Sequence, residues 1–192
     1  SGQIPSFIDS FFETVSGFTT TGASVLSDVE ALDQCMLFWR SFTHFIGGMG
    51  VLVFVLAIAK FSGGQSLHIL RAESPGPTVE KIFPRMNSTA KMLYIIYICL
   101  TMIQVILLCI FGMPFFDALL TSFGTAGTGG FAIKNAGIGA YSSACQTIIT
   151  IFMFLFGMNF NFYFLLLVRK FKQAFLEEIR WYFIIFTSAA II

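Results

Sequence analysis

The sequence predicts an all-α polytopic membrane protein, on the basis of three observations. Of its 192 residues, 56% are hydrophobic and only 11% are charged, against about 25% charged in an ordinary soluble domain. The mean hydropathy is +0.83, and several apolar runs are long enough to cross a bilayer. A soluble domain could not bury so much apolar surface and keep a polar exterior. A net charge of only +1 without a basic stripe excludes a nucleic-acid-binding protein.

Three apolar segments reach the length of about 20 residues that a transmembrane helix requires. They cover residues 35–59, 92–112 and 145–168. A fourth apolar run begins at Trp181 and reaches the last residue of the sequence. Because that run is too short to cross a bilayer, and because the first residues already resemble the start of a short helix, we expect the sequence to be a piece of a longer chain.

The positive charges predict the orientation of these segments. Residues 60–91 and 169–180 hold nine Lys and Arg residues, whereas residues 1–34 and 113–144 hold only Lys134. The first two segments are therefore expected on the inner side of the membrane and the other two on the outer side. The outer segments also hold six acidic residues, which form either a mouth that attracts cations or ordinary solvated loops.

Two further apolar segments are too short to cross a membrane. Residues 6–17 and 115–124 would form helices of about 15–18 Å, which is half a bilayer. Each is followed by a run rich in Gly and Thr. Short helices followed by irregular backbone are typical of re-entrant loops, which membranes tolerate only where the loop is buried in protein or lines an aqueous path.

The two short segments align at a fixed offset of 108 residues, which indicates an internal repeat. Thr20 aligns with Thr128, and Gly22 aligns with Gly130. The predicted unit is a span, a half helix, a Gly/Thr loop and a second span. Residues 1–59 then hold the pore loop and second helix of a first unit, and residues 60–91 form an inner linker. Residues 92–168 form a complete second unit, and residues 169–192 hold a linker and the truncated first helix of a third unit.

Such a unit suits a cation. A half helix that enters from outside directs its C-terminus, which carries about half a negative charge, toward the membrane centre. Glycine permits the backbone angles that aim successive carbonyls the same way, and rings of carbonyl oxygens can replace the hydration shell of an ion. One unit supplies only part of a ring, so several units must surround one pore. The alternative is that the glycines simply allow close helix packing.

Four motifs occur in an order that resembles a known superfamily. They are S-G-F-T-T-T-G-A-S, F-W-R with G-G-M-G, R-A-E-S-P-G-P and T-G-G-F, at residues 16–24, 38–50, 71–77 and 128–131. The sequence resembles the Trk/Ktr/HKT superfamily of potassium-uptake proteins, and within it the TrkH-like membrane subunits. This resemblance implies potassium uptake across the plasma membrane, in bacteria the cytoplasmic membrane. It also implies four M1–P–M2 repeats (helix, pore helix with filter loop, helix) around a pseudo-fourfold pore like that of a potassium channel.

The resemblance also implies which residues form the selectivity filter. They are Thr20, Thr21, Gly22 and Ala23 in the first repeat and Thr128, Gly129, Gly130 and Phe131 in the second. Within the plant branch of the superfamily, serine at the position of Gly22 goes with sodium preference and glycine with potassium, so the resemblance implies a preference for potassium. The third and fourth filter loops and the gating loop of the family lie outside this sequence.

The partners that the resemblance implies are a second copy of the protein and a cytoplasmic, nucleotide-binding RCK-type regulatory subunit. Residues 63–91 are either a contact surface for that subunit or a basic loop held near anionic lipid. Potassium is expected as the transported ligand, bound only through the filter residues, and no covalent cofactor is expected.

A few polar residues lie inside the predicted spans. Arg40 is expected to pair with Glu13 on the neighbouring half helix and to brace the filter, because a charge inside a membrane is usually paired. His44 is expected to be an interior residue whose hydrogen bonds are satisfied, rather than a proton site. Asn159 and Asn161 either line a cavity below the filter or hydrogen-bond between helices.

Two other classes of function remain as alternatives. A sodium- or proton-coupled symporter of the same superfamily would share these motifs. An unrelated secondary transporter would also use broken helices, but with the breaks in the middle of its spans. An enzyme is disfavoured because no Ser/His/Asp, H-E-x-x-H or phosphate-loop constellation occurs.

Overall fold

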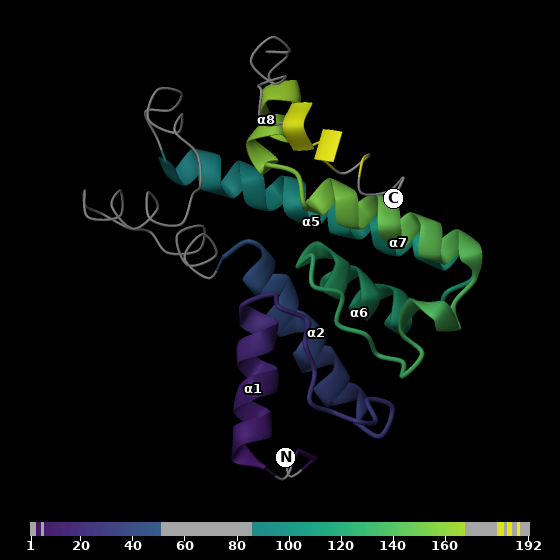
Figure 1. Cartoon of the computed structure of the whole chain (residues 1–192). Coiled ribbons are helices and arrows are strands. Elements are labelled where there is room, and N and C mark those ends of the chain that lie inside the picture. Colours follow the sequence, from purple (N-terminus) through teal and green to yellow (C-terminus); the bar gives the residue numbers. More distant parts are fainter. Residues whose placement is uncertain are drawn as a thin grey trace.

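The computed structural model describes residues 3–4, 6–50, 86–167, 180–182, 184–185 and 188. The regular structure within these residues is helical (Figure 1). The elements with several described turns are α1 (Phe7–Phe18), α2 (Gln34–Gly48), α5 (Met86–Ile110), α6 (Phe115–Ala126), the 3-10 helix η2 (Gly137–Ala140), α7 (Ser143–Phe156) and α8 (Phe160–Leu167). Among the described residues, Met92–Ile110 of α5 is the helical segment whose length and composition suffice to cross a membrane.

The two short helices predicted from the sequence are present as α1 and α6, and each has 12 residues. The Ser6 hydroxyl caps α1 by accepting a hydrogen bond from the backbone N–H of Asp9, which satisfies a donor that has no partner within the helix. Pro114 precedes α6 and lacks a backbone N–H that would need a partner. At 1.5 Å per residue both helices are about 18 Å long, which is half the thickness of a bilayer.

The predicted span at 145–168 is not one helix. It is divided into α7 and α8 at Gly157, whose backbone N–H turns back to the carbonyls of the last turn of α7. Two tyrosine hydroxyls compensate for the carbonyls freed there, because Tyr182 donates to Phe154 O at 3.0 Å and Tyr163 donates to Leu155 O at 2.7 Å. A helix break inside a membrane is tolerated where neighbouring groups satisfy the backbone in this way.

The helix α2 likewise ends at a glycine, Gly48. The predicted span at 35–59 therefore begins as a helix, and its remainder, together with most of the predicted inner linker at 60–91, lies outside the described residues. The segment from Met92 onward forms the expected helix, and α5 continues it back to Met86.

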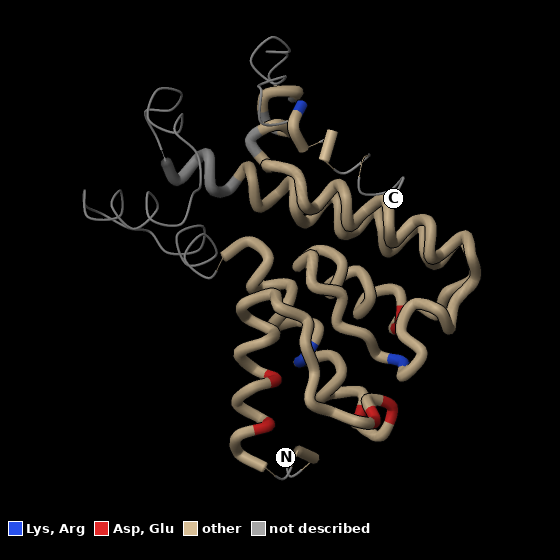
Figure 2. The backbone as a smooth tube through the Cα atoms, viewed as in Figure 1, with Lys and Arg blue, Asp and Glu red and all other residues tan. Residues whose placement is uncertain are grey.

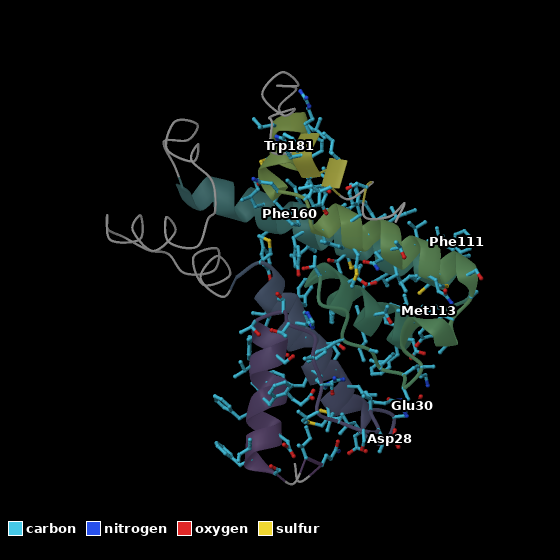
Figure 3. The ribbon with its side chains drawn as sticks, in the orientation of Figure 1. Asp28, Glu30, Phe111, Met113, Phe160 and Trp181 are labelled. Atoms are coloured by element: carbon cyan, nitrogen blue, oxygen red, sulfur yellow. The ribbon has the colours of Figure 1, made fainter. Side chains whose placement is uncertain are left out.

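The packing places α1 and α2 as a hairpin beside the group formed by α5, α6 and α7 (Figure 1). The helix α2 contacts α1 on one side and α6 on the other. A buried aromatic cluster joins the two groups, where Tyr97 of α5 is fully buried and donates its hydroxyl to Phe45 O at 2.9 Å. Most of the charged residues in the described part of the chain lie in the half of the molecule that contains α1, α2 and the segment with Asp28 and Glu30 (Figures 2 and 3).

Candidate functional site

The loops that follow α1 and α6 lie against each other in the structure. A Cβ atom added at Gly22 would lie 2.1 Å from the carbonyl oxygen of Gly129, and one added at Gly129 would lie 2.4 Å from the carbonyl oxygen of Thr20. Contacts this close are possible only because Gly22 and Gly129 have no side chain. The structure thus brings together the two sets of residues that the sequence analysis assigned to the filter.

The backbone of the two loops repeats the same unusual pattern. Thr20 and Gly22 have φ angles of +56° and +74°, and Thr128 and Gly130 have φ angles of +57° and +72°. The residue between the members of each pair does not have a positive φ. The sign of φ therefore alternates along both loops in the same way, at positions that differ by the predicted offset of 108 residues. Positive φ is strained for a β-branched residue and costs about 1–3 kcal/mol at each threonine. Strain of this kind is typical of functional sites.

Both loops begin with a backbone hydrogen bond at equivalent positions. The N–H of Thr20 donates to Gly17 O at 3.0 Å, and the N–H of Thr128 donates to Thr125 O at 2.8 Å. These are aligned pairs of residues at the ends of α1 and α6. The helix C-terminal ends therefore turn into the loops in the same way, although the next hydrogen bonds differ between the loops.

A buried ion pair packs against the first loop and also hydrogen-bonds to the second. Arg40 Nε of α2 lies 2.6 Å from Glu13 Oε2 of α1, and the two side chains are only 6% and 4% exposed. The other carboxylate oxygen of Glu13 accepts hydrogen bonds from the Ser24 hydroxyl at 2.7 Å and from the Val25 N–H at 2.8 Å. Arg40 also donates to Ala132 O at 3.1 Å. The pair therefore ties both loops to α2.

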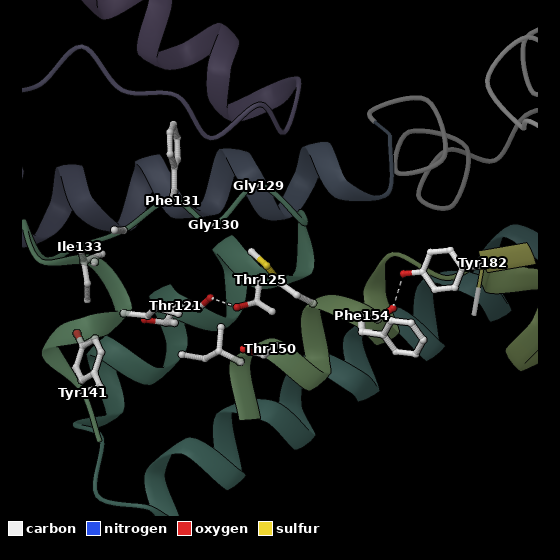
Figure 4. A pocket seen from close by; sticks show the side chains of 15 residues that line it. Thr121, Thr125, Gly129, Gly130, Phe131, Ile133, Tyr141, Thr150, Phe154 and Tyr182 are labelled. Carbon is white, nitrogen blue, oxygen red and sulfur yellow. Dashed lines mark hydrogen bonds between the residues drawn. The ribbon is translucent and has the colours of Figure 1, made fainter. Parts of the chain in front are cut away.

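The side chain of Phe131 anchors the second loop to α2. Its ring is buried and lies under the Arg40 guanidinium, whose carbon is 4.1 Å from the ring centroid. Figure 4 shows the ring pointing toward α2, away from Thr121 and Thr125. These two threonines instead line a cavity of about 490 Å³ on the other side of the loop, together with Thr150 of α7. The Phe131 ring therefore packs against the first hairpin, and Phe131 also belongs to the lining of that cavity, with Gly129 and Gly130.

The His44 ring of α2 lies behind the second loop and is fully buried. A Cβ atom at Gly127 would lie 2.1 Å from His44 Cδ2, and one at Gly129 would lie 2.2 Å from His44 Nε2. Neither ring nitrogen has a hydrogen bond of normal geometry among the described residues, and the Thr20 backbone interacts with the ring without meeting that geometry. The expectation that its hydrogen bonds are satisfied is therefore not confirmed. The backbone of Thr20 is the polar group recorded against the ring, and the surrounding glycines bring no side-chain donor or acceptor to it.

The chain matches the family described as TrkH: Cation transport protein over residues 1–191. It belongs to the TrkH family. The superfamily resemblance of the motifs is thereby confirmed, and so is the predicted location in the plasma membrane as a multi-pass protein.

The relatives of this TrkH-family chain include potassium-uptake proteins of the Trk system. It is 42% identical over 161 residues to the Trk system potassium uptake protein TrkH of Salmonella typhimurium, a match that covers 83% of the chain and 33% of the relative. It is 33% identical over 188 residues to TrkG of Escherichia coli, covering 97% of the chain and 39% of the relative. The crystal structure of the potassium transporter TrkH from Vibrio parahaemolyticus matches with a TM-score of 0.66 and 36% identity, covering 83% of the chain and 31% of the other. The chain thus spans about a third of the length of these relatives.

The two segments predicted on the outer side of the membrane are also joined, by a contact that the sequence did not predict. The Asn135 side chain accepts a hydrogen bond from the Val29 N–H at 2.9 Å and donates one to Asp28 at 2.8 Å, while the Asn135 N–H donates to Glu30 at 3.0 Å. The amide of Asn135 lowers the pKa of Asp28 below its ordinary value of 3.8. These two of the six outer acidic residues therefore hold the second loop, and a side chain more than 100 residues away could not be identified as their partner from sequence alone.

The two asparagines that the sequence placed deep in the third span lie beyond the break of α7. Asn159 is exposed and immediately precedes α8, and the side chain of Asn161 lies outside the described residues. Within the described part of the chain, no group of three or more His, Cys, Asp or Glu side chains is placed to hold a metal ion.

Proposed function

We propose that this chain supplies two of the filter segments of a potassium-uptake pore, at residues 20–23 and 128–131. The observation that carries the proposal is the matched backbone of the two touching loops, with positive φ at every second residue. Alternating backbone conformations turn successive carbonyls in one direction, which is the arrangement that replaces the hydration shell of an ion. The names of the relatives, potassium uptake proteins of the Trk system, support potassium as the ion.

The helices α1 and α6 contribute to this function through their C-terminal ends. Both helices end directly at a loop, with C-caps at Thr19 and Gly127. The negative end of each helix dipole then faces the place where a dehydrated cation would lie, and each end carries about half an electron charge. No covalent chemistry is required in this mechanism, and potassium is the transported ligand.

The same proposal includes the repeat architecture. In it, α1, its loop and α2 are the pore helix, filter loop and M2 helix of a first repeat at residues 1–59, and α5, α6 and α7–α8 are the M1, pore and M2 helices of a second repeat at 92–168. Residues 60–91 and 169–192 are then an inner linker and the start of a third repeat. Two loops form only part of a ring, so a pseudo-fourfold pore needs two more such repeats.

Partners follow from the resemblance alone. We propose a homodimer that binds an RCK-type regulatory subunit on the cytoplasmic side, with residues 63–91 as a contact surface. Copurification of the complete protein with such a subunit, and its loss when the basic residues of this segment are replaced, would test the contact.

Gly22→Ser tests the filter directly. The new Cβ would lie 2.1 Å from the Gly129 carbonyl oxygen at a residue with φ of +74°, so this backbone must move. The complete protein carrying Gly22→Ser is expressed in cells that lack potassium uptake, and growth on limiting potassium is measured together with uptake of potassium and sodium. We expect slower growth and a lower preference for potassium. Unchanged uptake and preference would show that the filter lies elsewhere.

A further inference from the structure

The buried imidazole behind the second loop has no role in the proposed uptake mechanism. His44 is 0% exposed, and both of its nitrogens are without a hydrogen bond of normal geometry. Leaving a buried polar group without such a bond costs about 1–3 kcal/mol, and an exception of this kind in a buried position calls for an explanation.

The shape of the surroundings supplies that explanation. The ring fills the space beside Gly127 and Gly129 that side chains would otherwise occupy, at 2.1 Å and 2.2 Å from their added Cβ atoms. It also meets the Phe131 ring edge-on, with centroids 4.8 Å apart. The ring also interacts with the backbone of Thr20, whose carbonyl oxygen, like His44 Nε2, lies next to Gly129. One side chain of α2 therefore touches the second loop at three residues and the first loop at one.

We propose that His44 is a positioning residue that sets the separation of the two filter loops and thereby the cation preference of the pore. This proposal rests on the filter assignment made above. Because interiors are close-packed, the ring determines how near the Gly129 backbone can come to Thr20 and Gly22. His44 acts through the loops and does not touch the ion, since its ring is enclosed by protein.

The experiment replaces His44 in the complete protein and measures uptake of rubidium, as a potassium analogue, and of sodium in cells that lack other potassium uptake. His44→Ala removes the spacer and is expected to lower the rubidium-to-sodium ratio by about tenfold, equivalent to about 1.4 kcal/mol. His44→Gln keeps a side chain of similar reach and is expected to stay within about threefold of the unaltered protein, or about 0.7 kcal/mol.

Phe45→Ala is the matched control. It removes an aromatic ring from the next position of α2, where the ring packs against Tyr97 and Phe123 and not against the loops. We expect it to lower the folded yield with little change in the rubidium-to-sodium ratio. A fall in that ratio equal to the fall for His44→Ala would overturn the proposal, since any core defect would then have the same effect.

Gly127→Ala approaches the same contact from the other side and serves if His44→Ala does not reach the membrane. Its Cβ would press on the His44 ring and backbone, so we expect a shifted ratio here as well. An unaltered ratio in both variants, with a shifted ratio in Gly22→Ser, would reject the role of His44 and retain the filter. An unaltered ratio in all three would reject the filter assignment itself.

Discussion

Replacing Arg40 by glutamine is expected to reduce folding far more than it changes ion preference. The change removes the cation from a pair whose side chains are 6% and 4% exposed and leaves the Glu13 carboxylate buried. Removal of one partner from a buried pair costs about 3–5 kcal/mol. Loss of the hydrogen bond from Arg40 to Ala132 O at 3.1 Å adds about 1 kcal/mol.

Together these costs, about 4–6 kcal/mol, are a large fraction of the total stability of a typical domain, which is about 5–15 kcal/mol. The Ser24 hydroxyl and the Val25 N–H still donate to Glu13, which limits the loss. The assay compares the detergent-solubilised yield and the thermal unfolding of the complete protein with and without the change, alongside the potassium-to-sodium uptake ratio of the protein that reaches the membrane.

Two variants make the test specific. Arg40→Gln combined with Glu13→Gln removes both buried charges and should recover part of the lost stability. Lys134→Gln breaks an ion pair with Glu30 that is 3.6 Å long and well exposed, and should change stability by at most about 1 kcal/mol. Normal yield and melting of Arg40→Gln, together with an altered ion preference, would refute a bracing role.

Three further changes test the packing and the outer contact. Gly17→Ala should destabilise the protein, because its Cβ would lie 2.2 Å from the hydroxyl oxygen of Thr43, and thermal unfolding measures the effect. Tyr97→Phe removes a buried hydroxyl that donates to a backbone carbonyl of α2, which should cost about 1–3 kcal/mol in the same measurement. Asp28 has a lowered pKa, so its stabilising contact with Asn135 is present above pH 3.8 and is lost as the pH falls further. The rate of pepsin cleavage near residues 28–30 should therefore rise in the unaltered protein as the pH falls below 3.8. In Asn135→Ala, which lacks this contact at every pH, that rise should be absent.

The short helices and their loops could be predicted because their signals are local. Each apolar run and the Gly/Thr sequence that follows it lie within about 20 residues of one another. The pairing of Arg40 with Glu13 could also be predicted, because a cation inside a membrane needs a nearby anion and the sequence has few acidic residues.

The break after α7 was missed for a physical reason. Gly157 lies in an apolar run that is otherwise continuous, and glycine is common in transmembrane helices. The groups that stabilise the break are the hydroxyls of Tyr163 and Tyr182, and no sequence pattern links them to the carbonyls they satisfy. Contacts between distant segments, such as that of Asn135 with Asp28, were missed because the partners are far apart in the sequence.

The position of the bound ion tests the proposed filter most directly. Crystals of the complete protein grown in rubidium would give an anomalous signal at each site where the ion binds. We predict a peak between residues 20–23 and 128–131, within coordination distance of their backbone carbonyl oxygens. Rubidium peaks confined to other parts of the protein, with none between these two loops, would contradict the proposal.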